Sequence, residues 1–157
     1  MYNHEPQTYT CPFCIVVSGK ESKKIDTNQA DVVYKDRFVT AFIAAHWWPN
    51  NPGHVIIVPN LHIENIYDIT GNVAVKIHRV AQLVAIAFKK VYECEGISTR
   101  QHNEPAGNQG VWHYHTHIFP RYTDDRLYEL FTEVRLAEPA ERKKYATKLK
   151  KYFELHP

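Results

Sequence analysis

The pattern of hydrophobic and polar residues predicts short strands in the first half of the chain. Two hydrophobic runs, 31–34 and 38–43, flank the polar residues 35–37 and predict two antiparallel strands joined by a tight turn. The β-branched run 54–58, closed by Pro59, is too short for a helix and is typical of a buried strand.

Helical periodicity follows these strands. Between residues 71 and 95 hydrophobic side chains recur at steps of three and one, which predicts one long helix with an apolar stripe. The stripe consists of Ile77, Val80, Ala81, Val84, Ala87, Phe88 and Val91. We expect this helix to end near Gly96. A second amphipathic segment, 138–153, predicts a solvated helix docked on the core, with Arg142 on its polar side.

The remaining segments predict loops and two further strands. Segment 46–53 holds two prolines and a glycine and is expected to be an irregular loop. Residues 97–100 predict a short strand, and segment 101–110 predicts a second loop. That loop leads into a strand over 111–119, which Pro120 ends.

Composition narrows the class of protein. A chain of 157 residues with 44% hydrophobic residues has room for one sizeable core. Its 19 basic and 17 acidic residues give a net charge of +2, which argues against a nucleic-acid partner. The chain has neither a secretion-signal pattern nor a run of about 18 apolar residues, so we expect a cytoplasmic protein with no membrane partner.

Three of the ten histidines alternate along the predicted strand 111–119. The period of two places His113, His115 and His117 on one face, with neighbours about 6.6 Å apart. Solubility alone does not explain a row of titratable rings, so the row indicates a catalytic or metal-binding site. Two kinds of site fit: a catalytic zinc site with an open position, and nucleophilic attack by a neutral imidazole on phosphorus.

Two segments carry a resemblance to a known family. They read PGHVIIVP at 52–59 and NEPAGNQGVWHYHTHIFPR at 103–121. Both resemble the blocks of the histidine-triad (HIT) family, whose signature is His-x-His-x-His followed by two apolar residues. The resemblance spans about residues 11–130. It implies a nucleotidyl hydrolase or transferase acting on the α-phosphate of a nucleotide conjugate, similar to nucleoside phosphoramidases and dinucleoside polyphosphate hydrolases.

The resemblance also implies roles for individual residues. His115 would be the nucleophile and would form a nucleotidyl-imidazole intermediate that water then cleaves. His117 and His54 would lie against the phosphate oxygens. Substrate contacts are implied for His46, Asn103, Gln109, Gly110 and Val111. Trp48 and its neighbour Trp47 would either stack on a base or pack in an interface.

Two positions depart from the family pattern. His46 stands where family members commonly carry Asp or Asn for the ribose hydroxyls, and an imidazole lacks the paired acceptors of a carboxylate. Gly110 stands where phosphoramidase-like and hydrolase-like members carry Ser or Thr, whose hydroxyl aids protonation of the leaving group. These departures motivate an alternative function, a nucleotide-binding HIT module with little or no turnover.

A Cys-x-x-Cys motif lies near the N-terminus. The resemblance to a zinc-bearing subset of the family implies that Cys11, Cys14, His62 and His113 hold a structural zinc ion, with no open position and no organic cofactor. A glutaredoxin-like redox centre is the rival interpretation. That motif needs a buried strand before it and a long helix after it, which the polar N-terminus and an early turn argue against.

These patterns and the resemblance together predict an α+β fold. We expect an antiparallel sheet of about five strands, one long helix packed on it and a C-terminal helical extension. The chain 1–157 is expected to be a single domain with a core of about 11–130 and an extension of about 131–157. Members of the HIT family are typically homodimers, so a homodimer that binds a nucleotide or nucleotide conjugate is expected.

Overall fold

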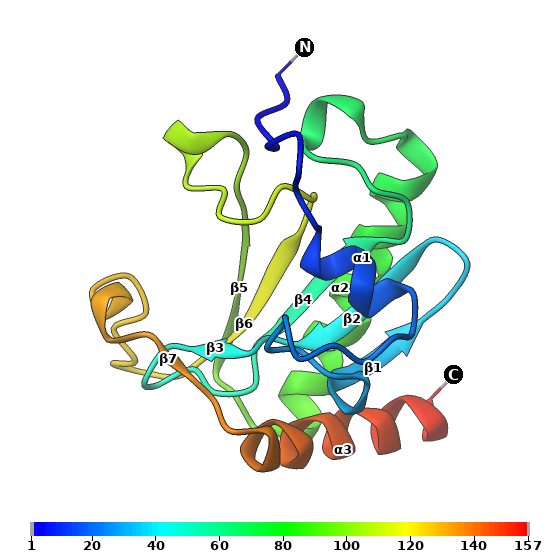
Figure 1. Cartoon of the computed structure of the whole chain (residues 1–157). Coiled ribbons are helices and arrows are strands. Elements are labelled where there is room, and N and C mark those ends of the chain that lie inside the picture. The colour runs from blue at the N-terminus through cyan, green and yellow to red at the C-terminus, as the bar shows by residue number, and fades with distance from the viewer. Residues whose placement is uncertain (1, 157) are drawn as a thin grey trace.

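The central sheet has five antiparallel strands in the order β1-β2-β4-β6-β5 in the computed structural model, which describes residues 2–156 (Figure 1). The strands are β1 (Val32–Lys35), β2 (Val39–Ile43), β4 (Val55–Pro59), β5 (Gly96–Gln101) and β6 (Thr116–Arg121). A separate two-stranded sheet pairs β3 (His46–Trp47) with β7 (Arg135–Leu136). The helices are α1 (Pro12–Val17), α2 (Gly71–Val91) and α3 (Pro139–Leu155), with 3-10 turns η1 (Gln29–Asp31), η2 (Ile66–Asp68), η3 (Pro105–Gly107) and η4 (Phe131–Glu133). The predicted α+β fold is confirmed.

Different helices cover the two faces of the sheet. Successive side chains of a strand point to opposite faces, so Ala41 and Ile43 of β2 join the core beneath α2 and α3. Phe42 packs on the other face against Phe13 of α1, with ring centroids 5.4 Å apart. Figure 1 shows α2 behind the sheet and α3 along its lower edge. The face that α1 covers only in part is left open for a cavity.

The long helix α2 confirms the predicted apolar stripe but ends earlier than expected. Ile77, Val84 and Phe88 are buried against the sheet. The helix stops at Val91 because Glu93 takes a left-handed conformation, with φ of 57°, and reverses the chain. The glycine at position 96 is therefore the first residue of β5 rather than a helix cap.

The position expected for Arg142 is wrong. Its side chain is only 1% exposed, and its Nε lies 3.1 Å from the carboxylate of Asp31, which is equally buried. This ion pair joins α3 to η1, two elements that are far apart in the sequence. The apolar side of the helix behaves as predicted, with Leu149 fully buried in the core.

Two expected boundaries also differ. His46 and Trp47 are not irregular, because they pair with Leu136 and Arg135 as β3 and β7. The strand β6 begins at Thr116, after a bend over 111–113, and continues through Pro120. Proline is tolerated there because β4 pairs with β6 only as far as Ile118, which leaves Pro120 a strand neighbour on one side only. Across residues 2–156, every helix is too short or too polar to cross a membrane.

Candidate active site

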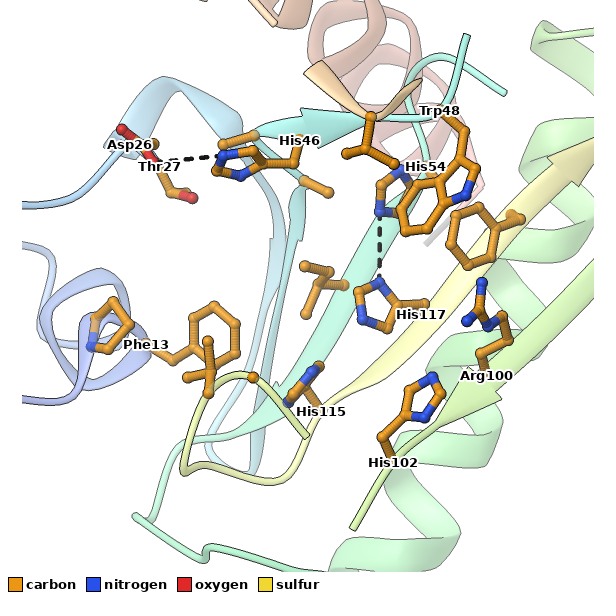
Figure 2. Close-up of a pocket in the computed structure, with 18 of the residues that line it drawn as sticks. Phe13, Asp26, Thr27, His46, Trp48, His54, Arg100, His102, His115 and His117 are labelled. Carbon is orange, nitrogen blue, oxygen red and sulfur yellow. Dashed lines mark hydrogen bonds and ion pairs between the residues drawn. The ribbon is translucent and has the colours of Figure 1, made fainter. Parts of the chain in front are cut away.

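A cavity of about 760 Å³ opens on the face of the sheet that α1 covers in part. Three of its lining histidines are those for which the sequence predicted catalytic roles: His54, His115 and His117. Figure 2 shows their rings gathered in the middle of the cavity, with Phe13 at one side. The volume lies within the range of about 300–1,000 Å³ that is typical of small-molecule sites.

The ring of His115 has a fixed orientation. Its Nδ1 lies 2.7 Å from the backbone carbonyl oxygen of His113. A carbonyl only accepts hydrogen bonds, so Nδ1 donates and the neutral ring keeps its lone pair on Nε2. Burial lowers the pKa of His115, against the opposing effect of that hydrogen bond. The ring is therefore a neutral imidazole at pH 7, which is the form that acts as a nucleophile.

The other two histidines form a pair beside it. Nδ1 of His117 lies 3.4 Å from Nε2 of His54, and the ring centroids of His117 and His115 are 5.1 Å apart (Figure 2). Burial, with Arg100 and His46 nearby, lowers the pKa of His54 to about 3. Burial also holds the pKa of His117 well below its usual value, and the charges of His115, His54 and Arg100 act in the same direction. Nδ1 of His54 is buried without a hydrogen-bond partner among residues 2–156.

The predicted substrate contacts divide into two groups. His46, Gly110 and Val111 line the cavity, and Nε2 of His46 lies 3.9 Å from a carboxylate oxygen of Asp26, which lines it as well (Figure 2). Neither Asn103 nor Gln109 is brought into its lining.

These two amides bind the surrounding loops instead. Oδ1 of Asn103 accepts the backbone N–H of Ile66 at 2.8 Å. The side-chain amide of Gln109 donates to the carbonyl of Glu64 at 2.6 Å, and its oxygen accepts the N–H of Glu104 at 2.8 Å. Both residues thus shape the loop between β5 and β6.

Sequence reasoning missed three basic residues of the cavity lining, Lys24, Arg100 and His102. Strand alternation could have pointed to the face on which Arg100 lies, but His102 follows the last residue of β5, where that alternation no longer holds. Residues 97–100 were predicted only as a strand, and in the loop after them substrate contacts were expected for Asn103, Gln109 and Gly110 rather than for His102.

The contacts of three further side chains near the cavity separate a lining residue from two that pack within the fold. Arg121 donates to both carboxylate oxygens of Asp125, at 2.6 and 2.8 Å, and does not line the cavity. Trp47 is buried and packs edge-on against Tyr145, whereas Trp48 lines the cavity. These contacts give Arg121 and Trp47 structural roles.

Four potential metal ligands meet beside α1. Cys11 caps this helix, Cys14 lies in its first turn, His62 follows β4 and His113 precedes β6. Their ligand atoms all lie within 4.8 Å of one another. Sγ of Cys14 is 3.2 Å from Nδ1 of His62 and 3.7 Å from Nδ1 of His113, and Sγ of Cys11 is 3.3 Å from Nδ1 of His113. These spacings are close to the separation of about 3.5 Å between ligands around a tetrahedral zinc ion.

The outer nitrogens of both imidazoles are already engaged. Nε2 of His113 lies 3.0 Å from the carbonyl oxygen of Pro59, and Nε2 of His62 lies 2.9 Å from the carboxylate of Glu5. Such partners hold a ligating imidazole in place and leave Nδ1 for the metal. Burial and the adjacent Cys11 raise the pKa of Cys14 to about 12, and a cation bound beside this thiol would favour its thiolate. The set could therefore hold a metal ion with no open position.

Comparisons with known proteins identify a family and several relatives. The HIT domain family model matches residues 26–124. The protein called "Protein hit" of Bacillus subtilis is 34% identical over 112 residues, which cover 71% of this chain and 71% of that protein. A bis(5′-adenosyl)-triphosphatase of Saccharomyces cerevisiae is 33% identical over 110 residues, which cover 69% of this chain and 52% of that protein.

The fold is also shared with a solved structure. A Zn-bound histidine triad family protein from Mycobacterium smegmatis matches with a TM-score of 0.76 and 22% identity. The match covers 94% of this chain and 95% of that chain. It extends beyond the family block, through almost the whole described structure.

Proposed function

Since the chain belongs to the HIT family, we propose that it is a nucleotide hydrolase or transferase that cleaves at the α-phosphate of a nucleotide conjugate. The yeast triphosphatase relative supports a hydrolase of this class. The observation that carries the proposal is the hydrogen bond from Nδ1 of His115 to the carbonyl of His113, since it leaves Nε2 free to attack.

The proposed reaction has two steps. Nε2 of His115 attacks the α-phosphorus and forms a nucleotidyl-histidine intermediate, and water then cleaves the bond between phosphorus and nitrogen. Negative charge on the phosphate oxygens grows in each transition state. Nδ1 of His117 and Nε2 of His54 can share one proton, and when Nε2 of His54 donates it, Nε2 of His117 carries the N–H that can donate to those oxygens.

The cluster of Cys11, Cys14, His62 and His113 is proposed to hold a structural zinc ion. The ion would tie the start of α1 to the segment that leads into β6. All four positions of a tetrahedral zinc ion are then filled by protein, so we assign it no part in the chemical steps.

The alternative is a nucleotide-binding module with little turnover. It is favoured by Gly110, which lines the cavity but has no side chain that could give a proton. It is also favoured by His46, which stands where relatives commonly carry Asp or Asn and whose ring lies 3.9 Å from Asp26. A binding module would keep its affinity for nucleotides and release no product.

The test is release of nucleoside monophosphate from adenosine and guanosine phosphoramidates and from dinucleoside polyphosphates. We expect release that is lost in His115→Ala and kept in His78→Ala, since His78 is exposed on α2 and does not line the cavity. No release from any substrate, with nucleotide binding intact by calorimetry, would move the protein to the binding class.

We also propose that the chain 1–157 acts as one domain and assembles as a homodimer. Val75, Leu83 and Ile86 leave an apolar surface on α2, at 56%, 40% and 45% exposure, which a second copy could cover. Light scattering should give twice the chain mass of 18.3 kDa, and Leu83→Glu should halve it. A monomeric wild-type protein contradicts the homodimer.

A further inference from the structure

Arg100 and His102 form a basic end of the cavity. Arg100 belongs to β5 and is the register partner of His117 in β6, His102 directly follows the strand, and both residues line the cavity. Figure 2 shows both side chains on one side of His115 and His117, with Phe13 on the other side. The proposed nucleophile therefore stands between two different parts of the cavity, one of which carries Arg100 and His102. Lys24, from the segment before η1, also lines the cavity.

The guanidinium of Arg100 has no carboxylate within ion-pair distance in the part of the chain that the structure describes. It lies 5.6, 5.7 and 5.9 Å from the ring centroids of Trp48, Phe119 and Tyr128. Aromatic faces hold a cation in place without neutralising it. Arg121, by contrast, is bound through two hydrogen bonds to Asp125. An arginine that is positioned but not neutralised, inside a cavity, favours an anionic ligand such as a phosphate.

The ring of His102 is held beside it. Its Nδ1 lies 2.6 Å from the carbonyl oxygen of Gly107, so this nitrogen donates and Nε2 is the free nitrogen of the ring. When protonated, the ring donates from Nε2 as well. The imidazole is thereby a second group that can contact an anion at this end of the cavity.

The chemistry of leaving groups gives an independent reason. An amine must gain a proton before it leaves phosphorus, whereas a phosphate leaves as an anion and needs no proton at neutral pH. Gly110 lines the cavity and has no side-chain proton to give, a departure from both kinds of relative. The unneutralised guanidinium of Arg100 is therefore the feature that suits a departing phosphate anion better than an amine.

We propose that Arg100, with His102 beside it, binds the phosphate next to the one that His115 attacks, so that the preferred substrates are dinucleoside or nucleoside polyphosphates rather than phosphoramidates. This inference rests on the proposed function. It assigns a specificity role to two residues and a chemical class to the leaving group.

The lone pair on Nε2 of His115 forms a bond to the α-phosphorus, and the bond from that phosphorus to the bridging oxygen breaks. The bridging oxygen keeps the electron pair and becomes a terminal oxygen of the departing phosphate, whose charge Arg100 offsets. Water oxygen then bonds to the α-phosphorus, the phosphorus–nitrogen bond breaks with its electron pair returning to Nε2, and one proton of the water is released.

The test compares two substrates that share the adenylyl group. We would measure kcat/KM for diadenosine triphosphate and for adenosine 5′-phosphoramidate with the wild type, Arg100→Gln and Arg126→Gln. Arg126 is the matched control, because it is exposed, pairs with Glu129 and does not line the cavity.

Arg100→Gln should lower kcat/KM for the triphosphate by about tenfold or more, the size expected for a lost charged hydrogen bond, and change the phosphoramidate value by less than about threefold. His102→Asn should act in the same direction with a smaller effect. Arg126→Gln should change neither value. An equal loss on both substrates, or no loss on the triphosphate, overturns the inference.

A binding measurement separates this inference from the proposed function. Calorimetry would compare AMP with α,β-methylene ADP, which carries a second phosphate and resists cleavage. The wild type should bind the methylene compound about tenfold more tightly than AMP, and Arg100→Gln should lose that advantage while still binding AMP, which shows that it folds. Equal affinities in the wild type overturn the inference, whether or not the protein releases AMP from any substrate.

Discussion

Nδ1 of His115 lies 2.7 Å from the main-chain carbonyl oxygen of His113. The same residue, His113, places its ring Nδ1 3.3 Å from the sulfur of Cys11, within the proposed metal cluster. One residue thus serves two sites, because its ring faces the cluster while its carbonyl sets the proton of the proposed nucleophile. A metal ion in the cluster would act on the reaction through the position of this carbonyl.

Loss of the metal should lower the stability of the fold, because all four proposed ligands come from the protein and none is left to take part in the reaction. We expect about one zinc ion per chain, and its loss in Cys14→Ser or on chelation should lower Tm by roughly 5–10 °C, because an ion that binds only the folded chain stabilises it. Metal analysis and thermal unfolding provide the measurement. Cys94→Ala is the matched control: this thiol is buried outside the cluster, so the variant should keep its zinc. Unchanged zinc content and Tm in Cys14→Ser would contradict the assignment.

The buried His54 should make the fold sensitive to acid. Burial first, then the charges of Arg100 and His46, lower its pKa to about 3, whereas an unfolded chain has a histidine pKa near 6.5. As the pH falls below about 6.5, the unfolded chain therefore binds a proton at His54 that the folded chain does not bind until the pH approaches about 3. The free energy of unfolding decreases as the pH falls between these two values.

Urea unfolding of the wild type and His54→Gln between about pH 7 and pH 5 tests this expectation. The free energy of unfolding of the variant should fall less steeply, because one of the buried neutral histidines is gone. His78→Gln, an exposed change on α2, should leave the wild-type slope intact. Parallel slopes for the wild type and His54→Gln would show that this ring is not the origin of acid sensitivity.

Local patterns predicted the elements of the fold well, because burial on one side of a strand or helix leaves a regular trace in the sequence. The stripe from Ile77 to Phe88 is such a trace. Arg142 was misplaced because its partner, Asp31, lies 111 residues away, and a helical pattern cannot reveal a distant carboxylate. When the partner is unknown, the sequence predicts that an arginine on an amphipathic helix is exposed to solvent.

The candidate site shows the same limit. The alternation that drew attention to His113, His115 and His117 depends only on neighbours in the chain. The structure places the rings of His115 and His117 in one cavity, whereas that of His113 faces the cysteine cluster and does not line the cavity. In the loop after β5 the backbone no longer alternates regularly, so sequence could not decide which side chain faces inward. The structure brings His102 into the cavity and turns Asn103 toward Ile66.

The ion pair of Arg142 and Asp31 offers a direct test of how α3 is attached. Removing one partner leaves the other charge buried, so Asp31→Asn should lower the free energy of unfolding by about 3–5 kcal/mol. Arg135→Gln is the control, since this arginine forms an exposed pair with Glu141 and should change little. Urea unfolding monitored by circular dichroism measures both. A small effect of Asp31→Asn would mean that α3 is held by its apolar face alone.

Two glycines separate the cost of backbone conformation from the cost of packing. Gly19 and Gly53 have almost the same positive φ, 77° and 75°. An added Cβ at position 19 meets nothing within 4 Å, whereas one at position 53 overlaps the ring of Tyr145 on α3. Gly19→Ala should therefore cost only the backbone penalty of about 1–2 kcal/mol, and Gly53→Ala should cost about 1–3 kcal/mol more.

The source of the excess can be identified with Tyr145→Ala, which removes the overlapping ring. In that background Gly53→Ala should cost no more than Gly19→Ala does, as measured by urea unfolding in a double-mutant cycle. Because Gly53 directly precedes His54, relief of the overlap should also restore the position of that ring in the cavity. If the excess persists without Tyr145, the penalty at position 53 lies in the backbone, and the close approach of α3 to this turn is not what requires glycine.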